Sequence, residues 1–383
     1  MLAALGIDAR YYTCFLVMAA YLFARPVNIL AMNFMRARGQ VLLLNLTNLA
    51  IRVLEIAVGF TLLLWIVGEL YGYLLGVAVV QVAATVFLLG WLLRHHSFAL
   101  SQVSAPLTYK LLGFGIPLLL TELAYLLLSY ADRFMIVAFN GQATLGAYTV
   151  GYNVPSYIND LVMFSLSYAI VPIYTELYGR EGKAATEVFL SRAADYYLMI
   201  VLPICIGYAA ISRDALVVLA STKYADAAGF SPLILLGLIF LGFNYILYAG
   251  LYLEKKTTQI LAIMVVAVFI NIAANLYLVP RYQAYGAAVA TLIACIVATV
   301  LTAMLGRRYL RVSPSLASFA YYLATSCAMY LIVTSIDLAS SWLNLLAKIS
   351  TGVVLMAIAA VARERDIRNV IVRRLRAAQG GLR

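Results

Sequence analysis

Charged residues are scarce in this chain, since Asp, Glu, Lys and Arg make up only 11% of its 383 residues while 65% are hydrophobic. This composition lies outside the range of soluble globular proteins. The chain has only two histidines and four cysteines, and neither type shows the spacing of a metal site or a redox motif, so we expect no metal and no cofactor. The cysteines lie in apolar segments, where we interpret them as small core residues.

Motifs that carry catalysis are also missing. The sequence contains no nucleotide-binding glycine loop, no HExxH and no GxSxG. Segments between apolar runs reach only about 15 residues, too short to fold a catalytic domain, so we do not expect an enzyme. His95 and His96 are adjacent in a basic loop, where we expect solvent or lipid headgroups around them.

Long apolar runs recur from one end of the chain to the other. A helix needs about 20 apolar residues to cross the hydrocarbon layer of a membrane. The runs predict about eleven transmembrane helices, near residues 11–34, 41–65, 70–93, 111–135, 144–177, 189–211, 229–253, 258–279, 284–305, 316–335 and 342–362. The expected fold class is therefore an all-α polytopic membrane protein.

The net charge of +11 is distributed unevenly over the loops. Most of the basic residues lie in alternate loops and in the tail from Arg363 to Arg383, and those in the loops are Arg36, Arg38, Arg94, Lys110, Arg180, Lys183, Arg192, Lys255, Lys256, Arg307, Arg308 and Arg311. Basic loops stay on the cytoplasmic side of a membrane. We therefore expect the cell inner membrane as the location, a cytoplasmic C-terminus, and no nucleic-acid partner.

Two stretches of the sequence resemble each other at a fixed offset of 214 residues. The matched positions are Tyr71-Gly72 with Tyr285-Gly286, Ala84-Thr85-Val86 with Ala298-Thr299-Val300, and Arg94 with Arg308. This spacing predicts that residues 11–93 are a copy of residues 229–305, as in transporters built by parallel duplication.

The duplication predicts how the chain is organised. We expect a partial first lobe of three helices, a basic linker, a second lobe of six helices, two additional helices and a basic tail, at 1–94, 95–110, 111–311, 312–362 and 363–383. The first lobe has three helices fewer than the second. We therefore expect the chain to be part of a longer transporter of about fourteen helices.

Ionisable residues inside the expected spans are the candidate functional residues, because a charge in mid-bilayer costs several kcal/mol unless it faces a polar cavity or a partner. They are Arg25, Arg52, Glu55, Glu122 and Asp160. The two arginines and Glu55 are candidates for a substrate cavity, since a guanidinium matches phosphate geometry. Arg52 and Glu55 are three residues apart and have the alternative of neutralising each other.

Glu122 and Asp160 are candidates for coupling to an ion, with ordinary hydrogen bonding within the helix bundle as the alternative. The expected span 144–177 is too long to be straight and contains Gly151 and Pro155, so it predicts a break or kink that frees backbone carbonyls. The alternative is an interfacial turn followed by an ordinary span. For the adjacent Asp132 and Arg133 we expect a role in fixing topology and capping the span at a helix end, with direct substrate contact as the alternative.

Several short motifs resemble those of the bacterial and archaeal polysaccharide flippases. They are Ser129-Tyr130-Ala131-Asp132-Arg133-Phe134-Met135-Ile136, Gly141, Leu145-Gly146-Ala147-Tyr148, Tyr152, Pro172, Asn271, Asn275-Leu276, Pro280 and Tyr285-Gly286-Ala287-Ala288. The resemblance implies the two-lobed fold of the superfamily that also contains the multidrug antiporters and the peptidoglycan-precursor flippases. It marks Asp132, Arg133, Gly146 and Tyr148 as family motif residues.

The resemblance also implies a function. Members of the family move polyprenyl-diphosphate-linked oligosaccharides across the cytoplasmic membrane by alternating access for polysaccharide assembly. The resemblance also suggests coupling to an H⁺ or Na⁺ gradient and polysaccharide assembly proteins as partners. A multidrug antiporter of the same fold is one alternative, and would depend on acidic residues such as Glu122 and Asp160. A membrane polysaccharide polymerase or ligase is another, but such enzymes usually carry a long external loop that this sequence lacks.

Overall fold

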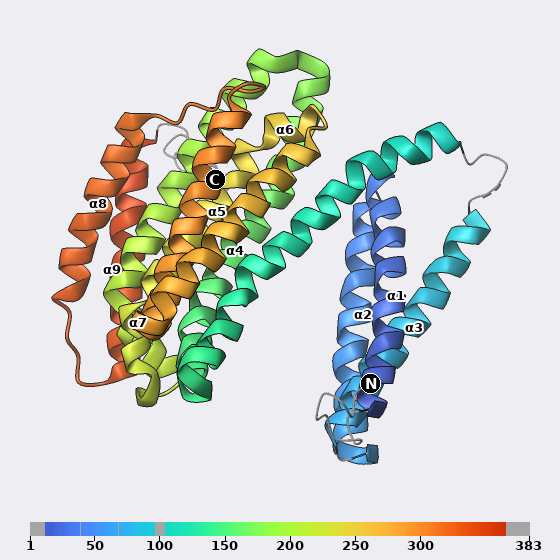
Figure 1. Cartoon of the computed structure of the whole chain (residues 1–383), viewed down its shortest axis with the longest axis horizontal. Helices are drawn as coiled ribbons and strands as arrows, with labels where there is room; N and C mark the ends of the chain where they lie inside the picture. The colour runs from blue at the N-terminus through green and yellow to red at the C-terminus, as the bar shows by residue number, and fades with distance from the viewer. Residues whose placement is uncertain (1–11, 39, 68, 96–103, 365–383) are drawn as a thin grey trace, which may run out of the picture. The chain divides into compact units, whose positions relative to one another are not determined.

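The computed structural model describes residues 12–38, 40–67, 69–95 and 104–364 (Figure 1). Within these ranges the chain forms helices and no strand. The elements are α1 (Tyr12–Ala37), α2 (Val41–Thr61), a π-helical turn η3 (Leu62–Val67), α3 (Leu70–His95), α4 (Ala105–Leu219), a 3₁₀ segment η5 (Thr222–Gly229), α5 (Ser231–Leu247), α6 (Ala249–Leu253), α7 (Thr257–Gly306), α8 (Leu316–Thr334) and α9 (Ser341–Arg363). The expected all-α membrane fold is confirmed.

Two of these helices turn back on themselves. In α4 the backbone leaves helical geometry at Gly141 and Gly182, which have φ of 81° and 80°, a region that glycine occupies without steric cost. These turns divide α4 into three parts, residues 105–140, 142–181 and 183–219. In α7 the break is at Gln283, with φ of 51°. Divided at these points, the described helices supply a segment for each of the eleven expected spans.

Of the predicted break or kink at Gly151 and Pro155, the backbone break is absent, because the second part of α4 keeps helical backbone angles through both residues. Proline has no N–H, so Pro155 leaves the carbonyl of Gly151 without its helical donor. The Ser231 hydroxyl donates to this carbonyl at 2.6 Å and is itself 2.6 Å from the Tyr208 hydroxyl. The sequence predicts this free carbonyl of Gly151, which in the structure accepts a hydrogen bond from the first residue of α5 and does not line a cavity.

The chain divides into two compact units, residues 1–105 and 106–383. In the first unit α3 packs against both α1 and α2. Its small core contains Met35, Leu88 and Ile51, all buried. Most other apolar side chains of this unit are exposed, as expected for helices whose outer faces contact lipid.

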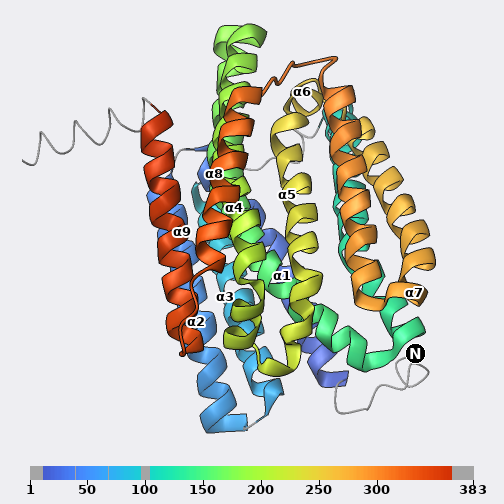
Figure 2. The ribbon, with the colours of Figure 1, turned by 90° about the vertical axis from the view of Figure 1, so that its left-hand side faces the viewer.

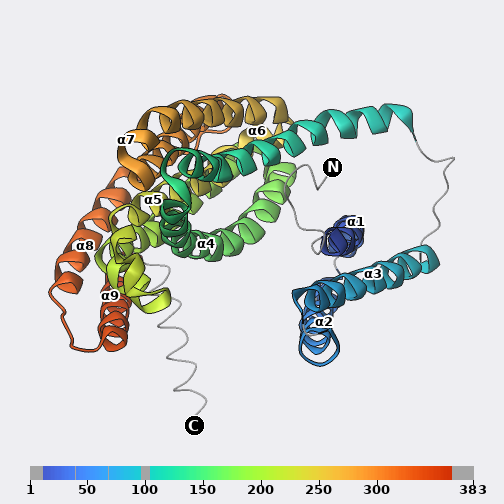
Figure 3. The same ribbon diagram turned by 60° about the horizontal axis from the view of Figure 1, so that its bottom comes forward.

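In the second unit α5 packs along α7, and α8 packs against α9. Figures 2 and 3 show α8 and α9 side by side at one end of this unit. One core cluster joins α4, η5, α5 and α7 and includes Tyr148, Phe230 and Ala287. Of the four cysteines, Cys295 is buried in a different core cluster, Cys14 and Cys205 are half-buried, and Cys327 is exposed on α8. The expectation that all four are core residues is therefore wrong.

Matching hydrogen bonds in the two units agree with the internal repeat. The Thr85 hydroxyl donates to the carbonyls of Gln81 and Ala24, at 2.8 and 3.2 Å. The Thr299 hydroxyl, 214 residues later, donates to the carbonyls of Cys295 and Phe240, at 2.9 and 2.8 Å. Within the first unit Thr85 thus joins α3 to α1, and within the second unit Thr299 joins the second half of α7 to α5.

Side chains of the third part of α4 hold the extended segment that precedes α8. They are acceptors spaced four residues apart, so they share one helical face. Backbone N–H groups of Arg311, Ser313 and Ser315 donate to Glu187 Oε1, Ser191 Oγ and Asp195 Oδ1 at 2.8, 3.0 and 2.7 Å. This ladder fixes where α8 and α9 begin relative to the rest of the second unit.

Replacing Asp195 with alanine is expected to destabilise this ladder by about 1.5–3 kcal/mol, the range for a hydrogen bond to a charged group. The expected result is faster trypsin cleavage after Arg307, Arg308 and Arg311, together with a lower Tm. Glu181→Ala is the control, since Glu181 is exposed and forms no ion pair with another described residue. Equal cleavage rates in the two variants would contradict a role for the ladder.

Candidate functional site

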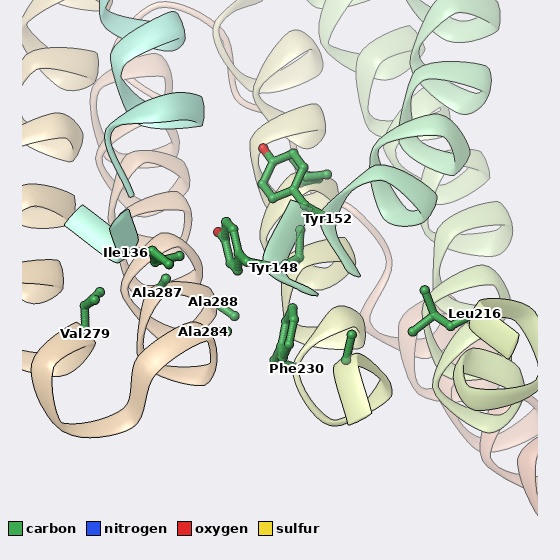
Figure 4. Packing of buried hydrophobic residues seen from close by; sticks show 12 residues of the cluster. Ile136, Tyr148, Tyr152, Leu216, Phe230, Val279, Ala284, Ala287 and Ala288 are labelled. Carbon is green, nitrogen blue, oxygen red and sulfur yellow. The ribbon is translucent and has the colours of Figure 1, made fainter. Parts of the chain in front are cut away.

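A carboxylate is buried in the second unit where three helical segments meet. Asp132 and Tyr148, on the first and second parts of α4, are both 0% exposed, and the Tyr148 hydroxyl donates to Asp132 Oδ2. The turn at Gly141 brings them together although they are 16 residues apart in sequence. Tyr148 belongs to the cluster that contains Ile136 and the alanines of α7 (Figure 4). The expectation that Asp132 lies at a helix end is therefore wrong.

Polar residues of α7 extend this site. Thr291 lies beside the Asp132 carboxylate and the Tyr148 hydroxyl. Asn271 donates to the Thr291 hydroxyl at 3.3 Å, and Asn275 donates to the Asn271 side-chain oxygen at 3.0 Å. Both asparagines are 0% exposed. A connected polar network thus runs through the core from α7 to Asp132.

Two acceptor oxygens of this network have no hydrogen-bond partner among the described residues, namely Oδ1 of Asp132 and Oδ1 of Asn275. A buried acceptor without a donor costs about 1–3 kcal/mol, and more when it is charged. Carboxylate, amide and hydroxyl oxygens are the groups that bind a proton or a small hard cation. The network, which we call the Asp132 cluster (Asp132, Tyr148, Asn271, Asn275 and Thr291), therefore suits a cation.

The other motif residues make different contacts. Arg133 lies over two aromatic rings, with Cζ 4.4 Å from the ring centroid of Tyr130 and 4.9 Å from that of Tyr152. Its Nε is buried and has no hydrogen-bond partner. At Gly146 a Cβ would meet nothing within 4 Å, so no close packing requires glycine there.

The candidate cations of the first unit have short-range partners. Arg25 donates to the Tyr21 hydroxyl at 2.7 Å and has no carboxylate partner among the described residues. Arg52 forms an ion pair with Glu55 at 2.9 Å, in which Glu55 is 7% exposed and Arg52 is 51% exposed. Mutual neutralisation of Arg52 and Glu55, one of the two interpretations from sequence, is the arrangement in the structure.

The candidate acids Glu122 and Asp160 are both exposed, on the first and second parts of α4. Neither forms an ion pair with another described residue. Glu122 lines a cavity of about 160 Å³ together with residues of α5 and α7. The structure does not bring these two acids into the Asp132 cluster.

An apolar groove lies between α4, α8 and α9. It has a volume of about 460 Å³, and Ile204, Ile211, Met329, Ile349 and Met356 are among the residues that line it. Lys348, the charged residue in its lining, forms an ion pair with Asp214 at 2.6 Å. The groove is otherwise a surface suited to a hydrocarbon chain.

Sequence reasoning did not single out some of these residues. Asn271 and Asn275 were noticed only within a family signature, and a pair of buried asparagines four residues apart in an apolar helix was the available signal. The partners Asp214 and Lys348 are 134 residues apart, and nothing in the sequence links them. The expected basic tail beyond residue 364 and half of the basic linker, residues 96–103, lie outside the described residues.

Comparison with known proteins agrees with the family motifs. A family model described as polysaccharide biosynthesis protein matches residues 7–229, and the model for the lipid II flippase MurJ matches residues 161–360. Each match covers more than half of the chain. An uncharacterized membrane protein, MJ1068, of Methanocaldococcus jannaschii is 26% identical over 191 residues, which are 49% of this chain and 37% of that protein. The chain thus spans well under half of this relative.

Solved structures show the same fold. The lipid II flippase MurJ in an inward closed conformation has a TM-score of 0.69 at 13% identity, and the alignment covers 92% of this chain and 74% of MurJ. A MATE transporter in a bent conformation has a TM-score of 0.68 at 14% identity, covering 85% and 73%. A MOP superfamily transporter from Pyrococcus furiosus, described as having a binding pocket of reverse polarity, gives 0.64 at 15% identity, covering 76% and 68%.

The helices, the motif residues and the family matches agree with one another. The chain is a multi-pass membrane protein with the exporter fold shared by MurJ and MATE transporters. It belongs to the polysaccharide biosynthesis protein family and matches the MurJ flippase family over its C-terminal half.

Proposed function

We propose that this protein moves polyprenyl-diphosphate-linked oligosaccharides across the cytoplasmic membrane for polysaccharide biosynthesis, by alternating access. The observation that carries the proposal is the groove of about 460 Å³ between α4, α8 and α9. A transporter of sugars alone or of small cations has no need of a long apolar groove, whereas a lipid-linked substrate must keep its hydrocarbon tail out of water. The family match supports the sugar part of the substrate.

The groove suits the tail better than another apolar cavity of about 480 Å³ between α2 and α3. That cavity has no charged lining residue, so nothing in it distinguishes a tail from bulk lipid. The groove has the Lys348–Asp214 ion pair in its wall. Charged side chains near lipid tend to lie toward the polar interface of the membrane. The ion pair therefore orients the lipid tail, because the polar end of the substrate lies at the same interface.

For the diphosphate we propose Arg25. Its guanidinium has five N–H donors, and the Tyr21 hydroxyl takes one at 2.7 Å. The remaining donors match the geometry of phosphate oxygens. Arg52 is a weaker candidate, because Glu55 already neutralises it.

For coupling we propose that the Asp132 cluster takes up H⁺ or Na⁺. It contains a fully buried carboxylate with an unbonded oxygen, which Glu122 and Asp160 do not provide because both are exposed. Binding of a cation would relieve the cost of this unpaired acceptor. The gradient would then drive the change between the two access states.

A multidrug antiporter is the second candidate function, and the exposed Glu122 beside tyrosines is the observation that favours it. An organic cation is attracted by a carboxylate and by aromatic faces. The groove for a hydrocarbon tail has no part in such a transporter, so we rank this function second.

Replacing Arg25 with alanine is expected to lower transfer of a fluorescent polyprenyl-diphosphate oligosaccharide between the leaflets of proteoliposomes by about tenfold or more. A charge-assisted hydrogen bond contributes about 1.5–3 kcal/mol, and 1.4 kcal/mol corresponds to a factor of ten. Arg25→Lys keeps the charge and is expected to recover part of the rate. Arg94→Ala, at an exposed arginine of α3, is the control.

The same assay separates the two candidate functions. If the wild-type protein leaves the lipid in place but exports a cationic dye such as ethidium, the antiporter is correct and the flippase proposal is wrong. If the lipid moves and Arg25→Ala moves it equally fast, the protein is a flippase whose diphosphate site lies elsewhere.

A further inference from the structure

A small polar cavity in the second unit lies apart from both the Asp132 cluster and the apolar groove. It has a volume of about 160 Å³ and is formed by the first part of α4, by α5 and by both halves of α7. Its polar lining residues are Thr121, Glu122, Tyr125, Asn244, Tyr245, Tyr248 and Thr302. We call it the Asn244 pocket. Neither the tail nor the coupling ion of the proposed function uses it.

The pocket has a buried floor and an exposed rim. Asn244 and Thr302 are 5% and 3% exposed, whereas Glu122 and Tyr245 are exposed. A carboxylate is not stable against lipid hydrocarbon, so the rim at Glu122 must border a hydrated space. The pocket therefore opens toward water and not toward lipid.

Asn244 gives the pocket an unused hydrogen-bonding group. Its side-chain oxygen Oδ1 is buried and has no hydrogen-bond partner. Leaving such an oxygen unpaired costs about 1–3 kcal/mol, which a bound donor would remove. A hydroxyl group of a bound ligand would supply the missing donor at the floor of the pocket.

The internal repeat holds a second asparagine in the same situation. Asn28 is four residues after Ala24, and Asn244 is four residues after Phe240, the two residues whose carbonyls accept from Thr85 and Thr299. Asn28 also has a buried Oδ1 without a partner. Both copies of the repeat therefore retain an unpaired amide oxygen at the corresponding position, which structural packing alone does not require.

Aromatic rings form the rest of the polar lining. Tyr245 and Tyr248 have ring centroids 5.5 Å apart with planes at 51°, and Tyr125 lines the pocket from α4. The positive C–H edges of a pyranose ring pack on the negative face of an aromatic ring, while its hydroxyls donate to carboxylate and amide oxygens. An aromatic wall with an amide, a carboxylate and hydroxyls is the combination that a sugar requires.

The volume limits the ligand to one small ring. The cavity of about 160 Å³ is well below the ~300–1,000 Å³ of a site for a drug-sized ligand. A single monosaccharide residue fits this size, whereas a whole oligosaccharide or a large organic cation does not.

We propose that the Asn244 pocket binds one sugar residue of the transported glycan and thereby selects for a substrate that carries sugar. The proposal rests on the proposed flippase function. Asn244 accepts from a sugar hydroxyl at the floor, Glu122 accepts from another at the rim, and the tyrosines cover a face of the ring.

The test compares two lipids in proteoliposomes, undecaprenyl diphosphate alone and undecaprenyl diphosphate carrying N-acetylglucosamine or galactose. The variants are Asn244→Leu, which removes the amide acceptor, and Glu122→Gln, which removes the negative charge and replaces one acceptor oxygen by an NH₂ donor. Neither variant adds bulk. Asn244→Leu is not expected to unfold the protein, since the oxygen that it removes has no partner. Each variant is expected to slow the sugar-bearing lipid about tenfold while the bare lipid keeps its rate, a change of 1.4 kcal/mol.

Matched controls remove the same groups outside the pocket. Asn140→Leu removes another amide whose buried oxygen is unpaired, and Glu176→Gln removes an exposed carboxylate that pairs with Arg180. Neither control is expected to change the ratio of the two transfer rates. Saturation-transfer NMR with N-acetylglucosamine and methyl galactoside on protein in sugar-free nanodiscs measures binding to the pocket without any transport.

The outcomes separate the sugar pocket from the flippase function. If wild-type protein moves neither lipid, the flippase proposal fails. The NMR experiment then still tests sugar binding, because a saturation-transfer signal that is lost in Asn244→Leu would show that the pocket binds a sugar. If the lipids move but the variants slow both equally, or neither, the sugar pocket is wrong. Loss of ethidium export in Glu122→Gln with an unchanged ratio for the lipids would assign the pocket to a cation and overturn the proposal.

Discussion

Replacing Asp132 with asparagine is expected to abolish the acceleration of lipid transfer by an H⁺ or Na⁺ gradient. The transfer rate of the wild type should rise when one of these gradients is applied, whereas the rate of the variant should be the same with and without a gradient. A coupling free energy of 1.4 kcal/mol corresponds to a tenfold rise, so we expect an effect of about tenfold or more. The physical reason is that asparagine retains an oxygen for the Tyr148 hydroxyl but has no charge for a cation to neutralise.

Thermal unfolding with and without 100-fold excess of Na⁺ over its Kd would measure ion binding separately from transport. A bound ligand at that excess stabilises by about 2.7 kcal/mol, so a Na⁺-dependent rise in Tm should be present in the wild type and missing in the variant. If the coupling ion is H⁺, neither protein responds to Na⁺, and only a pH gradient accelerates transfer.

Asp132→Asn is expected to fold well, because it removes a buried charge whose desolvation costs several kcal/mol. Tyr148→Phe should act in the opposite way, since it leaves the carboxylate without its donor, and a lower Tm is expected. Asp160→Asn is the matched control for coupling, as Asp160 is exposed on the same helix. Full gradient dependence in Asp132→Asn would show that the coupling carboxylate lies elsewhere.

Replacing Gly352 with leucine is expected to block the groove between α4, α8 and α9. Gly352 lies in the groove wall, and a Cβ there would approach the Met329 side chain at 3.4 Å, an ordinary contact that a flexible methionine accommodates. The rest of the leucine side chain would occupy space that the hydrocarbon tail needs. Each displaced methylene contact is worth about 0.8 kcal/mol, so loss of two would lower tail binding by about tenfold.

The measurement compares substrates with long and short tails. Transfer of an undecaprenyl-linked oligosaccharide should fall in Gly352→Leu, whereas transfer of a farnesyl-linked one, whose tail does not fill the groove, should change little. Val354→Leu is the control, because Val354 is exposed on α9 and does not line the groove. Equal loss for both tail lengths would mean that the substitution disturbs the packing of α8 and α9 and that the tail binds elsewhere.

Much of the fold was predictable because hydrophobicity and chain length determine where a helix spans a membrane. The sequence repeat was also informative, since the shared Ala-Thr-Val at residues 84–86 and 298–300 marks threonines that make matching hydrogen bonds. Of the break or kink predicted at Gly151 and Pro155, the break does not occur. Proline does free a carbonyl, but the Ser231 hydroxyl satisfies it without any loss of helical geometry.

The site was only partly predictable. The contact between Arg52 and Glu55 follows from their separation of three residues on a helix, which sequence alone provides. Asp132 and Tyr148 are recognisable as motif residues, but their contact depends on the turn that Gly141 makes with φ of 81°. Glu122 and Asp160 were both plausible acids, and only their exposure distinguishes them from the buried Asp132.

The sequence by itself determined that this is an all-helical membrane protein, where its helices lie, that it contains a repeat, and which family it resembles. These properties depend on local composition and spacing. Apolar segments of sufficient length move from water into the membrane as helices, and helix geometry then determines which residues share a face. Only the tertiary structure decided which polar residues meet. Asp132 reaches Thr291 and Lys348 reaches Asp214 across more than 130 residues, and such contacts depend on how whole helices pack.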